Sequence, residues 1–162
     1  MQLEVSKEVP IVKGTAANKG DKPFILNLSY NDIQKGYYSE ESSEDVLIQI
    51  CDPCLGFPTP KHPFHRTYQF EFCDIDENNS DKDMFDEFGM TVEQAEAIVM
   101  ILRKCLIEGR NVVVHCVAGV CRSGAVVEVG TMMGFRDTGT HRIPNVWVKT
   151  LLMRSMGWTY DN

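Results

Sequence analysis

The strongest indication of fold in this chain is a helix that leads directly into a short apolar strand. The capping-box pair Thr91 and Gln94 marks where the helix begins, and Gly109 marks where it ends. Between them, apolar residues recur at helical spacing. The segment 111–116 then reads Asn-Val-Val-Val-His-Cys, which is typical of a strand buried on both faces. This order predicts a β-α-β unit and therefore a parallel sheet.

Other segments extend the same pattern. Apolar runs at 23–30, 45–51 and 68–73 predict three further strands, and the last of them precedes the helix. Two more helices are predicted, one from Arg122 to Gly134 and one from Pro144 to Met156. Pro144 suits a first helical position, because a missing N–H is harmless there. The chain thus alternates strands and helices as an α/β protein does.

No part of the chain predicts a second domain. It has no internal repeat, no low-complexity run and no Gly-, Ser- or Pro-rich linker. The proline-rich segment 52–68 is interpreted as an ordered surface loop. We therefore expect one domain over residues 1–162, an α/β fold with a central, mostly parallel sheet of four to five strands flanked by helices.

Composition excludes several classes of partner. The net charge of −7 and pI of about 5.1 argue against a nucleic-acid backbone as a partner. Residues 1–13 lack the apolar core of a signal peptide, and no stretch approaches the ~20 apolar residues of a membrane span. We expect a cytoplasmic protein with neither a membrane nor a nucleic-acid partner. In that compartment its six cysteines are expected to be free thiols.

The candidate chemistry is concentrated where the strand 111–116 ends. The strand delivers Cys116 to the carboxyl edge of the sheet, where ligands bind in open α/β folds. The following residues turn tightly into a helix, so their backbone N–H groups can point inward together as an anion-binding nest. The predicted phosphate-binding residues are Val117, Ala118, Gly119, Val120, Cys121 and Arg122.

Individual side chains strengthen this interpretation. Gly119 permits a backbone conformation that most side chains forbid. Arg122 offers a planar fork that holds two phosphate oxygens. Together with the amide donors and the helix N-terminus, it favours the thiolate form of Cys116, so we expect an ionised nucleophile at neutral pH. His115 is expected to point away from the substrate and hold the loop, and Ser123 to donate to the sulfur of Cys116.

The stretch from Val112 to Ala125 resembles the H-C-x(5)-R-S/T signature of the protein tyrosine phosphatase superfamily. Its form, H-C-x-A-G-x-x-R-S-G, is most similar to the dual-specificity branch. The resemblance implies a dual-specificity-phosphatase-like fold and a cysteine-dependent phosphatase acting on phosphorylated proteins. In such an enzyme Cys116 is the nucleophile that forms a phosphocysteine and Arg122 binds the phosphoryl group. The mechanism invokes no cofactor and no metal.

The mechanism also needs an acid, because a hydroxyl leaves poorly unless it is protonated as its bond breaks. In the family this acid is an aspartate after the strand that precedes the signature. Here Asp74 occupies that place, and the segment 72–75, Phe-Cys-Asp-Ile, is similar to the strand-end acid of bacterial and viral relatives. Asp74 is the first choice, and Asp76, Asp81 and Asp83 are the alternatives.

Cysteines outside the nucleophile suggest weaker possibilities. Cys51 and Cys54 have C-x-x-C spacing, but structural zinc needs a second ligand pair, and the loop offers only two scattered histidines. Cys121, Cys54 and Cys73 are candidates for a reversible disulfide with Cys116. For Cys121 we favour the simpler interpretation of a small residue that packs under the loop.

Three functions compete. A protein phosphatase acting on phosphotyrosine, and also on phosphoserine and phosphothreonine, is favoured. The second possibility is the same chemistry on a phosphoinositide or an RNA 5′ triphosphate. The uncharged loop lacks the lysines of lipid phosphatases, and the acidic balance argues against RNA. The third is a phosphate-binding pseudophosphatase or a rhodanese-like sulfur carrier, against which Cys116, Arg122 and Ser123 argue together.

Overall fold

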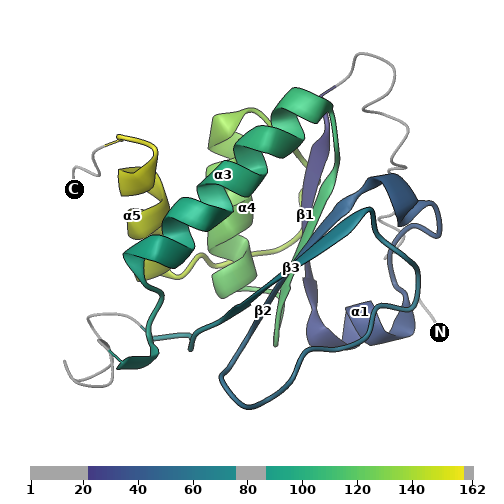
Figure 1. The fold of residues 1–162 in the computed structure, drawn as a ribbon, viewed down its shortest axis with the longest axis horizontal. Helices are drawn as coiled ribbons and strands as arrows, with labels where there is room; N and C mark the ends of the chain where they lie inside the picture. Colours follow the sequence, from purple (N-terminus) through teal and green to yellow (C-terminus); the bar gives the residue numbers. More distant parts are fainter. Residues whose placement is uncertain (1–21, 76–86, 159–162) are drawn as a thin grey trace.

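In the part of the chain that the structure describes, five parallel strands form the centre of the fold (Figure 1). The computed structural model describes residues 22–75 and 87–158. The strands are β1 (Phe24–Ser29), β2 (Val46–Cys51), β3 (Arg66–Glu71), β4 (Val112–Cys116) and β5 (Arg136–Asp137). Their order in the sheet is β3-β2-β4-β1-β5, and each neighbouring pair is parallel. The predicted α/β fold with a mostly parallel sheet of four to five strands is confirmed.

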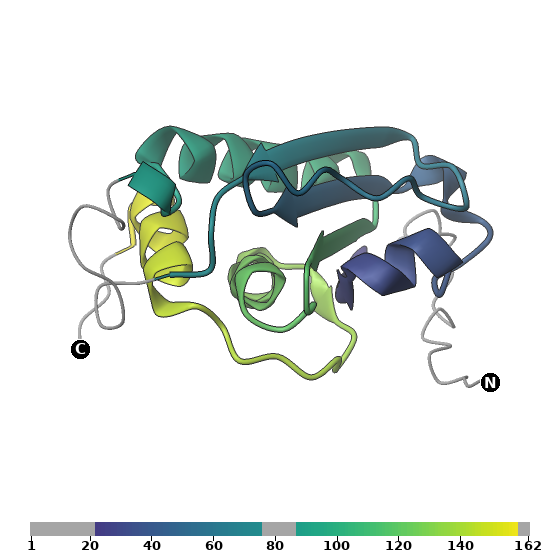
Figure 2. The same cartoon turned by 90° about the horizontal axis from the view of Figure 1, so that it is seen from below.

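Helices cover both faces of the sheet (Figures 1 and 2). On one face pack α3 (Val92–Glu108), α4 (Arg122–Met133) and α5 (Val146–Ser155). On the other face lies the short helix α1 (Tyr30–Lys35), and a 3₁₀ turn, η3 (Ser42–Glu44), precedes β2. Within the described ranges, no helix combines the length and the apolar character needed to cross a bilayer.

Alternate residues of the central strands β1, β2 and β4 enter different cores. In β4, Val112 and Val114 pack with the three helices on one face, whereas Val113 packs with Ile33 of α1 on the other. All of these side chains are buried. Because side chains alternate between the two faces of a strand, a central strand covered on both sides has to be apolar throughout. This explains the uninterrupted apolar run that predicted β4.

The structure corrects one strand boundary and adds one strand. The strand predicted at 68–73 is β3, which spans Arg66–Glu71. It ends early because the N–H of Cys73 donates to the carbonyl of Phe88, away from the sheet. The fifth strand, β5, has only two residues and no apolar pattern, so sequence periodicity does not reveal it.

Two of the three predicted helices begin where the sequence indicates, and the third does not. At α3, the predicted capping box is confirmed, and Gly109 ends the helix in the left-handed region. The helix α4 starts at Arg122 as predicted. The prediction that α5 starts at Pro144 is wrong. Asn145 is its N-cap, because the side-chain oxygen accepts a hydrogen bond from the Val148 N–H at 2.9 Å.

Candidate active site

The loop between β4 and α4, residues 117–121, turns its carbonyl groups outward. Four of them accept hydrogen bonds from the surrounding scaffold. The pairs are Val117 O with Tyr30 N (3.1 Å), Gly119 O with Asn27 Nδ2 (2.8 Å), Val120 O with Ile143 N (3.1 Å) and Cys121 O with Asn145 N (3.0 Å). The donors come from β1, from the start of α1 and from the segment before α5, so the loop is tied down on several sides.

Outward carbonyls leave the N–H groups of the same peptide units directed the opposite way, because the two dipoles of a trans peptide are antiparallel. The N–H groups concerned belong to residues 118, 120, 121 and 122. Within the described part of the chain, none of the four has a protein acceptor. The predicted nest of inward N–H groups therefore has a geometric basis, and its donors are available to an anion.

Gly119 is required by the turn for two reasons. Its φ of +79° lies in the left-handed region that disfavours other residues. A Cβ atom there would also lie 2.5 Å from the carbonyl carbon of Leu28 and 2.6 Å from the amide nitrogen of Ser29. The loop therefore approaches the backbone of β1 as closely as glycine allows.

The sulfur of Cys116 lies under this loop, on a side chain that is 2% exposed. The N–H groups of Gly119 and Ser123 donate to it at 3.3 and 3.5 Å, and the hydroxyl oxygen of Ser123 lies 3.2 Å away. Each of these donors, and the N-terminus of α4, stabilises negative charge on the sulfur. The sulfur is thus buried and surrounded by hydrogen-bond donors.

The guanidinium group of Arg122 is fixed along one edge. Its Nη1 donates to Oδ1 of Asp52 at 2.6 Å and to the carbonyl oxygen of Phe72 at 2.7 Å. Its Nε is buried and has no partner among the described residues. A buried donor without a partner is costly, which points to a ligand that this group would bind.

Asp52 is a site residue that sequence reasoning missed. It follows β2, the strand next to β4 in the sheet, so its carboxylate reaches the same carboxyl edge as Cys116. An acidic residue directly after a strand is the available signal, but it becomes meaningful only when the strand order is known.

His115 faces away from the sulfur of Cys116. It shares the α1 face of β4 with Val113, whereas Cys116 shares the opposite face with Val114. Its Nδ1 lies 3.2 Å from the carbonyl oxygen of Cys116, and its ring meets the edge of Tyr30 at 6.2 Å between centroids. Burial lowers the pKa of His115 to about 4, so its imidazole is neutral at pH 7.

Asp74 lies beside the loop. Its Oδ1 accepts a hydrogen bond from Nδ2 of Asn145 at 2.7 Å, and Asn145 in turn donates its backbone N–H to Cys121 of the loop. Burial and, second, the neighbouring Asp74 carboxylate raise the pKa of the Cys121 thiol. The structure thus brings Asp74 and the loop together through Asn145, which sequence reasoning also missed. The alternatives Asp76, Asp81 and Asp83 lie outside the described residues.

The other cysteines do not form a second centre. All six cysteines are free thiols. Cys51 is buried, and burial raises its pKa to about 11, whereas Cys54 is exposed at a φ of 70°. Residues 22–75 and 87–158 contain no group of three or more His, Cys, Asp or Glu side chains arranged to hold a metal ion.

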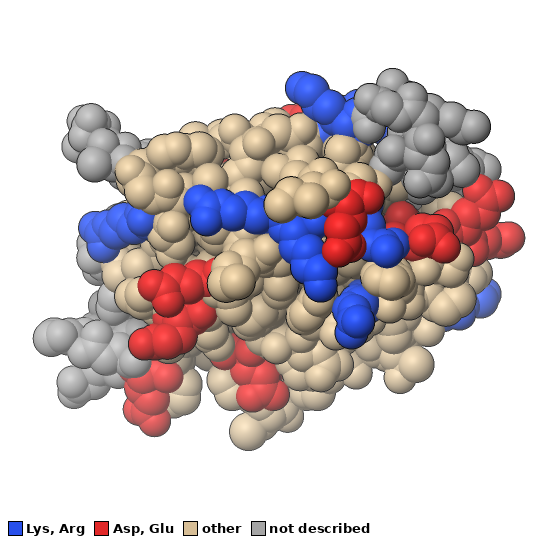
Figure 3. All heavy atoms as spheres, turned by 45° about the horizontal axis from the view of Figure 1, so that its top comes forward, with Lys and Arg blue, Asp and Glu red and all other residues tan. Residues whose placement is uncertain are grey.

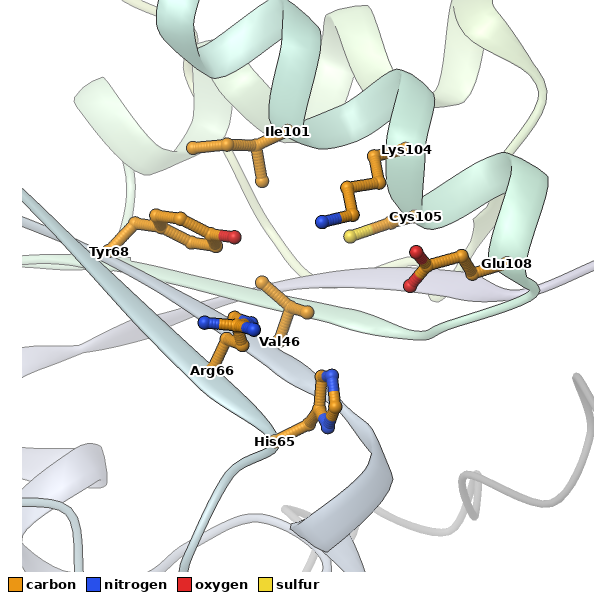
Figure 4. Close-up of a pocket in the computed structure, with 8 residues that line it drawn as sticks. All are labelled: Val46, His65, Arg66, Tyr68, Ile101, Lys104, Cys105 and Glu108. Atoms are coloured by element: carbon orange, nitrogen blue, oxygen red, sulfur yellow. The ribbon is translucent and has the colours of Figure 1, made fainter.

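A small pocket lies away from the loop, between α3 and the strands β2 and β3 (Figure 4). It is lined by Val46, His65, Arg66, Tyr68, Ile101, Lys104, Cys105 and Glu108. Its interior volume of about 10 Å³ is enough for roughly one water molecule. No ligand chemistry is therefore assigned to it.

No protein-family model and no curated protein matches the chain. Solved structures do resemble it. The human tyrosine phosphatase-like serine/threonine/tyrosine-interacting protein is 17% identical, with a TM-score of 0.49 over 85% of this chain and 83% of that one. Human DUSP28 is 13% identical, with a TM-score of 0.48 over 86% and 84%. OH1 from the Orf virus, described as a tyrosine phosphatase with triple substrate specificity, is 19% identical, with a TM-score of 0.41 over 80% and 72%. Similarity at this level assigns no activity, which has to rest on the site itself.

Proposed function

We propose that this chain is a cysteine-dependent phosphatase of the protein tyrosine phosphatase superfamily, with residues 1–162 as one domain. Its substrates are phosphotyrosine and also phosphoserine and phosphothreonine in proteins, and it acts in the cytoplasm. The observation that carries the proposal is the combination at the end of β4. There, the buried Cys116 sulfur lies under a loop in which the N–H groups of residues 118, 120 and 121 lack protein acceptors among the described residues. The N–H and the buried Nε of Arg122 are equally unpartnered. This donor set fits a tetrahedral anion bound against a sulfur nucleophile.

In the first step, the Cys116 thiolate attacks phosphorus and the ester P–O bond breaks. The bond's electron pair goes to the leaving oxygen, which takes the proton of Asp74. The loop N–H groups and Arg122 hold the three remaining phosphoryl oxygens. The products are a phosphocysteine, the dephosphorylated hydroxyl and the Asp74 carboxylate.

In the second step, water attacks the phosphocysteine and gives a proton to the Asp74 carboxylate. The S–P bond breaks and its electron pair returns to sulfur. The hydroxyl of Ser123, 3.2 Å from the sulfur, is placed to stabilise the departing thiolate. Inorganic phosphate leaves, and the thiolate and the protonated acid are regenerated.

Two observations favour a protein monoester over other phosphates. Val117, Ala118, Val120 and Cys121 contribute no positive charge with which to bind the additional phosphates of an inositol headgroup. On the face shown in Figure 3, basic side chains are interspersed with acidic ones and do not form a groove of one sign. RNA binding relies on such continuous positive charge.

The test compares phosphate release from four substrates: a phosphotyrosine peptide, a phosphothreonine peptide, a phosphoinositide and triphosphate RNA. We expect release from the peptides, unaffected by excess EDTA. The Cys116→Ser variant should have no turnover but should still bind orthovanadate. Binding of orthovanadate by the wild-type protein without turnover of any substrate would indicate a pseudophosphatase. Wild-type rates in the Cys116→Ser variant would overturn the mechanism.

A further inference from the structure

We infer that Asn145 is a positioning residue that fixes the Asp74 carboxyl group over the phosphate loop and determines which of its oxygens carries the proton. This inference rests on the proposed function, because it assigns a role to the acid of that reaction. It concerns a residue just before α5, outside the segment from Val112 to Ala125 that resembles the phosphatase signature.

Every polar group of Asn145 is engaged. The residue is 7% exposed, although Asp74 beside it is exposed to solvent. Its hydrogen bonds are Nδ2 to Asp74 Oδ1 (2.7 Å), Nδ2 to Ile75 O (3.3 Å), Oδ1 from Val148 N (2.9 Å), N to Cys121 O (3.0 Å) and O from Lys149 N (3.0 Å). One buried residue thus joins the acid segment, the phosphate loop and the first turn of α5.

A capping role explains only part of this arrangement. Serine, aspartate and asparagine cap a helix about equally well, and each needs only one oxygen to do so. The Val148 N–H requires Oδ1 of Asn145, which fixes the orientation of the amide and turns its NH₂ group towards Asp74. Capping therefore does not need the amide nitrogen, which donates instead to the segment that carries Asp74.

The amide also determines where the proton of Asp74 can reside. An NH₂ group only donates, so the oxygen that it contacts, Oδ1, has to act as an acceptor. In the protonated acid the proton then belongs on Oδ2, the oxygen that Asn145 does not hold. Because the same residue donates to Cys121 O, the position of Oδ2 is set relative to the loop that binds the phosphoryl group.

The first test separates positioning from capping by means of Asn145→Ser. Serine keeps the cap but cannot reach Asp74. We expect kcat on phenyl phosphate, which has a poor leaving group, to fall about 10-fold. On p-nitrophenyl phosphate, whose leaving group needs no proton, the rate should change little, and orthovanadate binding should be unchanged. Gly109→Ala, which strains the left-handed C-cap of α3 at the opposite end of β4 from the loop, controls for lost stability alone.

The second test uses Asn145→Asp, which also keeps the cap but replaces the donor with an acceptor. Two carboxylates at this separation hold a shared proton more tightly than one does. The alkaline limb of the pH–rate profile on phenyl phosphate should therefore move to higher pH by about one unit. A residue that only caps α5 would leave this limb in place.

The outcomes distinguish the inference from the function on which it rests. If Asp74→Asn shows the leaving-group-dependent defect but both Asn145 variants behave as wild type, positioning by Asn145 is refuted and the phosphatase mechanism stands. If Asp74→Asn itself shows no such defect, the acid assignment fails. If both Asn145 variants lose rate equally on the two aryl phosphates, and Gly109→Ala loses as much, Asn145 has only a structural role.

Discussion

At the scale of single residues, different nitrogen atoms of Arg122 anchor the side chain and remain available to a ligand. Asp52 and the carbonyl of Phe72 occupy Nη1, and this fixes the plane of the guanidinium. The Nε, which has no partner among the described residues, lies on another edge of the same plane. A planar group held in this way can present two parallel donors to a phosphoryl group, which a lysine ammonium group cannot do.

Arg122→Lys should therefore be costly although the charge is kept. We expect kcat on a phosphotyrosine peptide to fall by about 10²–10³-fold, with a smaller change in KM, because the fork fits the equatorial oxygens best as the phosphoryl group flattens. Steady-state kinetics would check this expectation. A variant altered in KM alone would show that Arg122 contributes only to ground-state binding.

Asp74→Asn should affect chemistry rather than binding. We expect kcat on a phosphopeptide to fall by about 10²–10⁴-fold and kcat on p-nitrophenyl phosphate to fall far less, because only the first leaving group needs a proton. The alkaline limb of the pH–rate profile should also disappear. Asp76→Asn should show neither effect, and the reverse pattern would make Asp76 the acid.

At the scale of elements, the conformation of the loop between β4 and α4 depends on how closely it approaches β1. Gly119 touches the backbone of that strand, and the side chain of Asn27 in β1 donates to the Gly119 carbonyl at 2.8 Å. Contacts with β1 thus determine the conformation of the loop. The glycine in its sequence only permits that conformation.

Gly119→Ala should destabilise the fold by several kcal/mol and abolish orthovanadate binding, because the new Cβ would collide with the β1 backbone. Gly139→Ala is a matched control. Gly139 has a φ of +80°, but a Cβ atom added there would meet no other atom within 4 Å, so this variant isolates the backbone cost of about 1 kcal/mol. Urea unfolding would measure both. Equal losses in the two variants would contradict a role for the β1 contact.

Local pattern predicted those parts of the fold that depend on nearby residues. The capping box of α3, the apolar run of β4 and the turn before α4 all lie within about 35 consecutive residues and confirm the β-α-β unit. Asn27, Asp52 and Asn145 were not predicted, because each meets the loop or Arg122 only through contacts between distant parts of the chain. Asn27 and Gly119, for example, are 92 residues apart in the chain.

At the scale of the whole molecule, the two ends of the sheet differ in chemistry. The carboxyl ends of the strands carry the candidate site, whereas Asp45 lies buried at the amino ends. Its Oδ1 accepts a hydrogen bond from Asn111 at 3.2 Å, and Asn111 accepts one from the N–H of Phe24 at 2.9 Å. Burial raises the pKa of Asp45 to about 7. The folded protein therefore holds a proton that the unfolded chain releases near pH 4.

Asp45→Asn should remove the pH dependence of folding stability that Asp45 causes. Because the folded pKa exceeds the unfolded value, Asp45 contributes stability at low pH that is lost as the pH rises to about 7. Asparagine keeps the acceptor for Asn111 without ionising. The free energy of unfolding of the variant minus that of the wild type should therefore increase from pH 4 to pH 7, by at most about 4 kcal/mol, and then level off.

The contribution of His115 to folding stability changes with pH in the opposite direction over part of this range. Its pKa is lowered by burial to about 4, so its contribution to stability is lost as the pH falls from 6.5 towards 4. The difference between the Asp45→Asn variant and the wild type cancels this term, because both proteins contain His115. Urea titrations at several pH values would give the difference, and a constant value across the range would contradict the buried proton on Asp45.

The pairing of β1 with β4 has a consequence for the order in which the chain folds. At one end of the pair, Ser29 lies opposite Cys116. At the other end, Phe24 donates to Asn111, which is 87 residues further along the chain. Closing so long a segment costs entropy before any contact compensates for it, and such non-local pairings slow folding. During synthesis, β1 therefore has no central partner until the chain has been made as far as Cys116. The sulfur reaches its donors only when the sheet closes, so the ability to bind an oxyanion should be among the last properties that a refolding chain regains.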